Sequence, residues 1–291
     1  MHLRESLVSA ISLLTVERVP SPRLNAELLL MFTLSCDRAY LFAHPERELT
    51  ADEKVRYESA LSERSRGVPA QYITGHQEFW GMDLIVTPAV LIPRPETEHL
   101  IETVLILAGE NGTERRDRAP SKGLRMVDVG TGSGCIALAL AKEFAGSEIH
   151  AVDISAAALE IALANASRHQ LEQRIQFHQT DLLESLSLSN LDFIVSNPPY
   201  VGETEQDQVQ LEVRRFEPRN AVFAGRTGTE VIARLIPQAR VALRPGGWLV
   251  LEVSGTVARA VQRLLADWDD VRVIPDLQAI PRVVQARKPL G

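Results

Sequence analysis

The chain has 291 residues, of which 45% are hydrophobic, so it can form one large domain or two of ordinary size with a buried core. Its formal net charge of −7 gives no overall attraction for nucleic acid, and its two cysteines, Cys36 and Cys135, have no CxxC or metal-type spacing. We therefore expect neither a disulfide framework nor a zinc site. We also expect no signal peptide and no membrane span. The composition fits a cytoplasmic protein with reduced cysteines and without a metal.

The first part of the chain, from residue 3 to about 75, has the hydrophobic periodicity of helices. Ser21 is a candidate N-cap, and Thr50 with Glu53 predicts a capping box before a helix that runs to about Gly67. Residues 1–75 contain nine Lys and Arg against ten Asp and Glu. This balance is not typical of a DNA-binding module, so a small helical bundle with another role is expected.

The periodicity changes after the helical part. Residues 78–86 are predicted to form a strand pair with a turn near Gly81. Glu96 is predicted to open a helix that runs to about Ala108, and the polar residues 109–123 are predicted to form an exposed loop. The strand pair is therefore the expected connector between two parts of the chain.

From residue 124 the predicted elements alternate. Strands are predicted over 124–129, 148–152, 174–178, 191–196 and 248–253. Helices are predicted over about 134–144, 155–169, 228–243 and 256–267, with a less regular stretch over 201–226. Two late strands near 271–274 and 282–287 are expected to pair as an antiparallel edge. Repeated strand–helix units predict an α/β fold with a mostly parallel sheet covered on both faces, and ligands bind outside the carboxyl ends of such strands.

A glycine-rich turn follows the first of these strands, from Asp128 to Gly134. Glycines at such a turn let the backbone bend tightly and approach a ligand. The acid-x-Gly-x-Gly-x-Gly order resembles motif I of S-adenosylmethionine-dependent methyltransferases. A dinucleotide fingerprint fits only in a relaxed form from Gly132 to Ala137, and the lysine of a P-loop is absent. A turn that only packs a helix on a strand is the alternative.

Two acidic residues follow the next strands. Asp153 ends the second strand, where a carboxylate can accept both ribose hydroxyls of a nucleotide or cap the helix that begins near Ser155. Asp181 follows the third strand. It is either a helix cap or, as the resemblance to methyltransferases implies, an acceptor beside a bound adenine. Spacing alone does not separate these interpretations.

The motif Asn197-Pro198-Pro199-Tyr200 follows the fourth strand. Neither proline has an N–H for a strand ladder, so the strand ends in a stiff turn. The Asn197 side-chain oxygen and the Pro198 carbonyl can accept the two N–H bonds of a planar amine, and Tyr200 can stack on it. The motif resembles motif IV of methyltransferases that modify adenine N6, cytosine N4 or a glutamine amide.

Taken together, the motifs resemble the release factor glutamine methyltransferase family, also called the HemK or protein-(glutamine-N5) methyltransferase family. The resemblance runs through nearly the whole chain. It is carried by residues 21–29, 69–75, 78–81, 91–98, 128–134, 195–200, 217–219 and 243–248.

This resemblance implies a Rossmann-like methyltransferase domain over 93–291 with a mostly parallel seven-stranded sheet. A helical substrate-docking domain over 1–75 and a β-hairpin connector over 76–92 would precede it. The implied reaction is methylation, by S-adenosylmethionine, of the glutamine amide in the Gly-Gly-Gln motif of class 1 peptide chain release factors. On the same basis Asn197, Pro198 and Tyr200 are the catalytic residues, and these three with Pro199 bind the glutamine. The methyl donor would contact Gly130, Thr131, Gly132, Ser133, Gly134, Asp153, Asp181, Leu182 and Asn197.

The chain departs from the family pattern at three places. Position 182 is Leu where some members carry an aromatic residue, Ala279 stands where glycine is expected, and Gly255 lies one place later than the family glycine. Three other functions remain as alternatives: an adenine-N6 or cytosine-N4 methyltransferase of nucleic acid, a dinucleotide-dependent oxidoreductase and a binding protein without catalysis. The charge balance of residues 1–75 favours a protein substrate over nucleic acid.

Overall fold

A computed structural model describes residues 1–110, 123–184 and 186–290 of the chain. The loop predicted over 109–123 therefore lies almost entirely outside the described residues. Contacts between residues divide the chain into two compact units. The first unit contains residues 1–76 and 210–216, and the second contains residues 77–209 and 217–291.

The first unit is a small helical bundle, as predicted. Its helices are α1 (Leu3–Val16), α2 (Pro22–Leu34), α3 (Arg38–Ala43), α4 (Ala51–Ser65) and α5 (Ala70–Thr74). The predicted capping box is confirmed, because Thr50 Oγ1 accepts from the Glu53 amide at 3.2 Å and Glu53 Oε2 accepts from the Thr50 amide at 2.9 Å. Ser21 is the N-cap residue of α2, as predicted, and the helix begins at Pro22. The Ser21 hydroxyl makes no capping hydrogen bond, however, and its backbone is left-handed (φ +49°).

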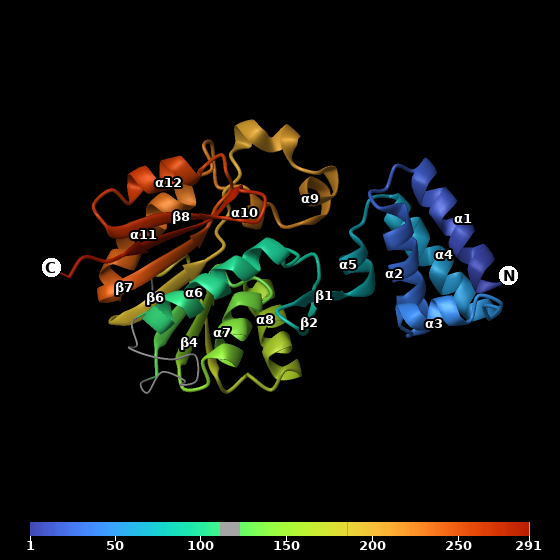
Figure 1. The fold of residues 1–291 in the computed structure, drawn as a ribbon, viewed down its shortest axis with the longest axis horizontal. Helices are drawn as coiled ribbons and strands as arrows, with labels where there is room; N and C mark the ends of the chain where they lie inside the picture. The colour runs from blue at the N-terminus through green and yellow to red at the C-terminus, as the bar shows by residue number, and fades with distance from the viewer. Residues whose placement is uncertain (111–122, 185, 291) are drawn as a thin grey trace. The chain divides into compact units, whose positions relative to one another are not determined.

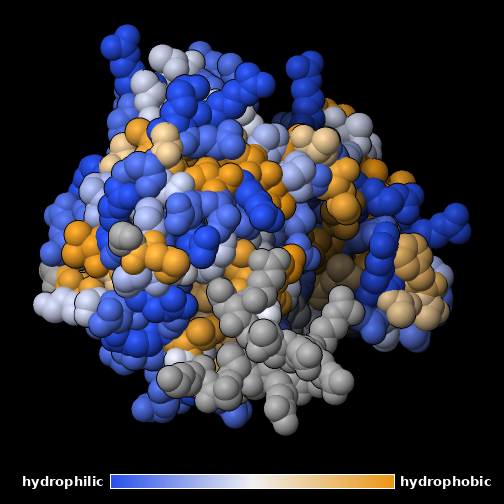
Figure 2. All heavy atoms as spheres, turned by 60° about the vertical axis from the view of Figure 1, so that its left-hand side comes forward, coloured by the Kyte–Doolittle hydropathy of each residue, from blue (hydrophilic) through white to orange (hydrophobic). Residues whose placement is uncertain are grey.

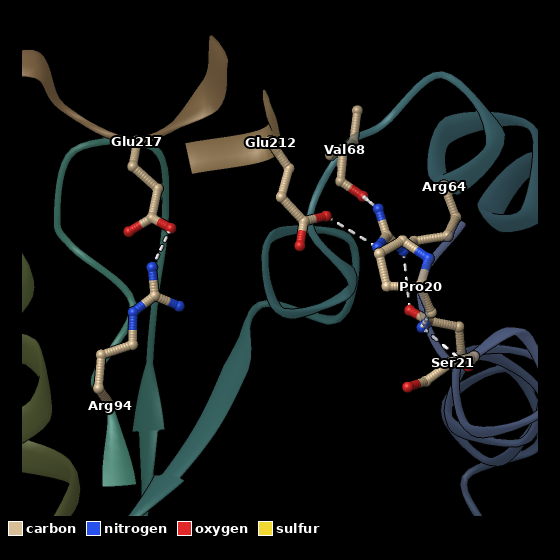
Figure 3. A network of polar contacts seen from close by, with 8 residues as sticks. Pro20, Ser21, Arg64, Val68, Arg94, Glu212 and Glu217 are labelled. Atoms are coloured by element: carbon tan, nitrogen blue, oxygen red, sulfur yellow. Dashed lines mark hydrogen bonds and ion pairs between the residues drawn. The ribbon is translucent and has the colours of Figure 1, made fainter. Parts of the chain in front are cut away.

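A short helix from the later sequence, α9 (Leu211–Phe216), completes the first unit. Arg64 on α4 is 3% exposed and donates from Nη2 to Glu212 Oε2 of α9 at 2.8 Å. The same guanidinium donates to the Val68 carbonyl at 2.9 Å (Figure 3). It also donates to Asn25 Oδ1 at 2.8 Å. A buried arginine with these partners holds α9 to the bundle, since an unpaired buried charge is costly.

The predicted strand pair is confirmed at the start of the second unit. It consists of β1 (His76–Phe79) and β2 (Met82–Ile85), joined by Trp80 and Gly81 with φ values of +53° and +67°. Asn165 of α8 (Ala156–Arg168) holds β2 from the side. Its side chain accepts from the Ile85 amide at 2.6 Å and donates at 2.9 Å to the Ile85 carbonyl and to the Ser133 carbonyl. One buried amide therefore connects the hairpin to the glycine-rich turn.

The second unit is built on a seven-stranded, mostly parallel sheet, which confirms the predicted fold class (Figure 1). In spatial order its strands are β5 (Ile175–Gln179), β4 (Glu148–Asp153), β3 (Arg125–Val129), β6 (Leu191–Ser196), β7 (Leu243–Glu252), β9 (Pro281–Arg287) and β8 (Asp269–Pro275). Pairs from β5 to β7 are parallel, and β9 pairs antiparallel with both β7 and β8. The late strands thus pair as predicted, although β9 lies inside the sheet and β8 alone forms the edge at that end.

Helices cover both faces of this sheet (Figure 1). On one face α6 (Glu98–Glu110), α7 (Cys135–Glu143) and α8 pack in one buried hydrophobic cluster. On the other face α11 (Glu230–Ala242) and α12 (Ala258–Leu264) pack in a second cluster. The sheet therefore has an apolar core on each side, and its strands read as nearly continuous hydrophobic runs for that reason.

Three predicted boundaries differ from the structure. Strand β7 begins at Leu243, five residues before the predicted start, because Gly246 and Gly247 exchange main-chain hydrogen bonds with Lys288. Helix α12 is shorter than predicted. The irregular stretch 201–226 contains three short helices, namely η2 (Glu203–Gln208), α9 and α10 (Arg219–Val222).

The surface is mixed in polarity. Figure 2 shows hydrophobic residues in separate groups between hydrophilic ones on one face of the molecule. Four of the large exposed hydrophobic side chains of the second unit lie on four different helices: Ile106, Leu163, Val241 and Leu264. Others lie outside the helices: Ile154, Leu277, Ile280 and Leu290.

Candidate active site

A cavity of about 310 Å³ lies at the carboxyl ends of the central strands of the second unit. Its wall combines the turns after β3, β4, β5 and β6 with two further segments, one before α6 and one around α10. The predicted site residues in this wall are Gly130, Thr131, Gly132, Ser133, Asp153, Asp181, Leu182, Asn197 and Pro199. The edge of the sheet where ligands are expected is therefore hollow.

The glycine-rich turn forms one wall of the cavity. Gly130 and Gly132 have φ values of +75° and +54°, and a Cβ added to either would meet no protein atom within 4 Å. The turn is held against β4, because the Gly130 and Thr131 amides each donate to the Val152 carbonyl at 2.9 Å. Backbone can therefore contact a ligand here without any intervening side chain.

Gly134 has a different role in the same turn. Its φ is +86°, and an added Cβ would lie 3.2 Å from the Cβ of Ala162 on α8. It is not part of the cavity wall. The structure therefore places Gly134 where α7 and α8 pack closely, at the beginning of α7.

Asp128 stabilises the glycine-rich turn through side-chain hydrogen bonds. Its carboxylate is buried and accepts from the Thr131 hydroxyl at 2.6 Å and from the Ala137 amide at 3.1 Å. Burial raises the pKa of Asp128 to about 7, and the hydrogen bonds from Thr131 and Ala137 oppose that rise. The carboxylate thus connects the turn to the first residues of α7.

Asp153 lies in the cavity wall at the end of β4. Its two carboxylate oxygens accept from the Gly132 amide and the Ser155 amide, both at 2.9 Å. The side chain that caps α8 is Ser155, which accepts from the Ala158 amide at 3.2 Å. A carboxylate has about four acceptor positions, so Asp153 keeps acceptors for ligand hydroxyls.

Asp181 and Leu182 form the wall after β5. Asp181 accepts from Arg234 Nη2 of α11 at 2.6 Å, and Arg234 also contacts Glu184 at 3.0 Å. Leu182 has a left-handed backbone, with φ of +54°. Among the described residues, those that follow Asp181 form a turn rather than a helix. Asp181 therefore does not cap a helix there.

The motif Asn197-Pro198-Pro199-Tyr200 lies beside the glycine-rich turn. Strands β3 and β6 are parallel neighbours, and Val129 pairs with Ser196 just before the two turns begin. Asn197 and Pro199 line the cavity, and Asn197 Nδ2 donates to Thr97 Oγ1 at 3.1 Å. Among the described residues Asn197 Oδ1 makes no hydrogen bond, so this oxygen is available as an acceptor.

Tyr200 and Pro198 lie outside the cavity wall. The Tyr200 hydroxyl donates to Glu252 Oε1 of β7 at 3.1 Å, and its ring packs against the cluster between the sheet and α11. Burial raises the pKa of the Tyr200 hydroxyl, with further contributions from the Glu252 charge and from the hydrogen bond to it. The site thus brings Asn197 and Pro199 to the glycine-rich turn, with Pro198 and Tyr200 behind them.

Sequence reasoning missed two polar residues of this site, Thr97 and Glu252. They are 1% and 2% exposed. Thr97 belongs to the Leu91–Glu98 motif, and Glu252 ends the strand before the displaced Gly255, so both stand in stretches that the sequence marks out. Thr97 accepts from Asn197 Nδ2, and Glu252 accepts from the Tyr200 hydroxyl because β7 lies beside β6.

An ion pair between the buried Glu217 and the half-buried Arg94 connects the two segments that complete the wall. Glu217 accepts from the Arg94 guanidinium and, through Oε2, from the Ile92 amide at 3.1 Å (Figure 3). Leu91 and Pro93 line the cavity on one side of this pair, and Pro218 lines it on the other. Glu217, which lies in the stretch predicted to be less regular, therefore holds the two segments together.

No group of three or more His, Cys, Asp or Glu side chains among the described residues could hold a metal ion. No helix in the described part of the chain has both the length and the apolar character needed to cross a membrane.

Comparison with known proteins agrees with this architecture. Residues 5–75 match the family model described as the PrmC N-terminal domain, and residues 117–215 match the methyltransferase small domain. The crystal structure of the N-terminal domain of human METTL16 in complex with SAH is similar in fold. Its TM-score is 0.52 at 18% identity, and the match covers 89% of this chain and 90% of that one. The fold and the cavity define an S-adenosylmethionine-dependent methyltransferase.

Two curated relatives specify the kind of methyltransferase. A release factor glutamine methyltransferase from Koribacter versatilis (strain Ellin345) is 55% identical over 99% of both chains. Another from Xylella fastidiosa (strain 9a5c) is 41% identical over 97% of this chain and 98% of its own. The chain belongs to the release factor glutamine methyltransferase family, which confirms the resemblance found in the sequence.

Proposed function

We propose that this protein transfers a methyl group from S-adenosylmethionine to the side-chain amide nitrogen of the glutamine in the Gly-Gly-Gln motif of class 1 peptide chain release factors. The observation that carries the proposal is the pairing of β3 with β6. It places the glycine-rich turn and Asn197 in the wall of one cavity. A methyl donor and a planar amide bound there would be close enough for direct transfer.

The residues of the cavity fit S-adenosylmethionine. Gly130 and Gly132 leave backbone open to the ligand, and the Asp153 carboxylate has acceptors for the two ribose hydroxyls. We assign the same ligand to Thr131, Ser133, Asp181, Leu182 and Asn197, and Gly134 would support it through helix packing. Because Asp181 is already paired with Arg234, an adenine amino group would share that carboxylate.

The turn after β6 would hold the glutamine. Asn197 Oδ1 and the Pro198 carbonyl accept the two N–H bonds of the substrate amide, while Pro199 and Tyr200 shape the pocket. These acceptors direct the nitrogen and stabilise positive charge on it as the bond forms. S-adenosylmethionine supplies a methyl group on a sulfonium sulfur, so the nitrogen–carbon bond forms as the sulfur–carbon bond breaks with its electron pair left on sulfur, and the nitrogen then loses one proton.

The rest of the chain would serve recognition. We propose that residues 1–75 dock the release factor, that residues 76–92 connect this helical domain to the rest, and that residues 93–291 are the methyltransferase domain. Arg64 and Glu212 add the segment 210–216 to the docking part. We also propose that the protein is cytoplasmic and does not bind nucleic acid directly. The charge balance of residues 1–75 supports the second of these points.

Incubation with labelled S-adenosylmethionine tests this function. A purified class 1 release factor should become labelled, and the same factor with the glutamine of its Gly-Gly-Gln motif replaced by alanine should not. An oligonucleotide duplex and tRNA, offered separately, should stay unlabelled. Label in nucleic acid alone would overturn the proposal in favour of the adenine or cytosine alternative.

A further inference from the structure

Helix α11 holds the turn after β5 through two side chains that lie one helical turn apart. Arg234 Nη2 donates to Asp181 Oδ2 at 2.6 Å and to Glu184 Oε1 at 3.0 Å. Gln238 Oε1 accepts from the Leu183 amide at 2.8 Å. These contacts hold the turn against α11, so Asp181 and Arg234 lie side by side in the cavity wall.

The paired side chains of Arg234 and Asp181 keep hydrogen-bonding groups for a ligand. An arginine has five N–H bonds, and the two hydrogen bonds of Arg234 both start from Nη2. Its Nε and Nη1 donors have no acceptor among the described residues. Asp181 accepts through Oδ2, and in the same part of the chain its Oδ1 has no donor. An open acceptor and open donors are therefore neighbours in the cavity wall.

The order of the strands indicates which part of S-adenosylmethionine would reach this pair. Strands β6, β3, β4 and β5 are successive neighbours, about 4.8 Å apart. The reacting methyl group belongs beside Asn197 after β6, and the ribose belongs beside Asp153 after β4. The base then extends to the turn after β5, where Asp181 and Arg234 lie. The methionine carboxylate is on a different arm of the sulfonium, so the same arrangement directs it away from Arg234.

The hydrogen-bonding groups of adenine match this pair. The end of the base farthest from the ribose carries the N6 amino group, which donates, beside the ring nitrogen N1, which accepts. Asp181 Oδ1 can accept from N6 while an Arg234 N–H donates to N1. We propose that Arg234 is a specificity-determining residue that recognises the adenine of S-adenosylmethionine at N1. The inference rests on the proposed function and extends it to a residue of α11 that lies outside the sequence motifs.

Analogues of S-adenosylhomocysteine that differ in one ring atom test this role by calorimetric binding. The 1-deaza analogue, in which C–H replaces N1, should bind the parent protein roughly tenfold or more weakly than S-adenosylhomocysteine, because one hydrogen bond from a charged group is lost. The 7-deaza analogue should bind within about threefold of S-adenosylhomocysteine, because N7 is not on this edge of the base. Equal binding of S-adenosylhomocysteine and the 1-deaza analogue would overturn the inference.

Arg234→Leu separates recognition of the base from support of the turn. The variant should bind S-adenosylhomocysteine roughly tenfold more weakly than the parent does, and its affinity for the 1-deaza analogue should stay within about threefold of the parent value. The matched control is Arg240→Leu, because Arg240 is also on α11 and pairs with a carboxylate, that of Asp267, but does not line the cavity. The control should keep the preference of the parent. An equal loss of affinity for both ligands in Arg234→Leu would mean that Arg234 only supports the turn, which would overturn the inference.

These measurements use the full chain without a release factor, so their result does not depend on the protein substrate. A parent protein that fails to bind S-adenosylhomocysteine would contradict the assignment of the methyl donor, and with it both the proposed function and the role of Arg234. Normal binding of S-adenosylhomocysteine without a preference over the 1-deaza analogue would refute the role of Arg234 alone.

Discussion

Replacement of Asn197 by alanine is the most direct perturbation of the candidate site. It removes the Oδ1 acceptor that the turn after β6 offers to a substrate amide, together with the hydrogen bond to Thr97. Loss of one positioned group that stabilises charge in a transition state costs about 2–4 kcal/mol, which corresponds to a roughly 30- to 1,000-fold lower kcat. The fold should change little, because one net hydrogen bond contributes only about 1 kcal/mol.

The assay is single-turnover methylation of a release factor at saturating S-adenosylmethionine. Calorimetric binding of S-adenosylhomocysteine and thermal unfolding are measured on the same samples. Asn220→Ala is the matched control, since Asn220 also lines the cavity but lies outside the turn after β6. We expect the control to keep most of its rate.

Two results would refute the reasoning. Near-normal turnover by Asn197→Ala would mean that another group accepts from the substrate amide. A loss of rate matched by an equal loss of S-adenosylhomocysteine binding would mean that Asn197 serves only the methyl donor.

Three further predictions concern the support of the site. Asn165→Ala should lower the free energy of unfolding in urea by about 3 kcal/mol, because three hydrogen bonds to buried main chain are lost, and a change below about 1 kcal/mol would contradict this. Gly134→Ala should lower it by roughly 1–2 kcal/mol through its positive φ and the contact with α8, whereas Gly146→Ala, which meets no atom within 4 Å, should not. Asp128 has a folded pKa of about 7 against an ordinary value of 3.8, so the folded protein binds an extra proton between these values and loses stability as pH rises. Asp128→Asn removes this pH dependence. The unfolding free energy of the variant minus that of the parent should therefore increase by at most about 4 kcal/mol between pH 3.8 and about pH 7. A difference that does not change with pH would oppose the assignment.

The local chemistry of the chain determined much of the fold. Helical periodicity and the Thr50 capping box identify the bundle, and the alternation of strands and helices after residue 124 identifies the parallel sheet. The start of β7 could not be predicted from the local sequence, because Gly246 and Gly247 form main-chain hydrogen bonds with Lys288, which lies far along the chain. Likewise, nothing local indicates that residues 210–216 pack with the first unit through Arg64.

The sequence by itself also identified the two turns of the candidate site, since glycines and prolines carry their conformational meaning locally. The sequence alone predicts that two segments, Asp128 to Gly134 and Asn197 to Tyr200, form turns that contact a ligand. Only the tertiary structure decided which groups stand behind them. Glu252 accepts from Tyr200 because β6 and β7 are neighbours, and Glu217 pairs with Arg94 across more than a hundred residues of chain. Such contacts follow from strand order and packing, which no local pattern specifies.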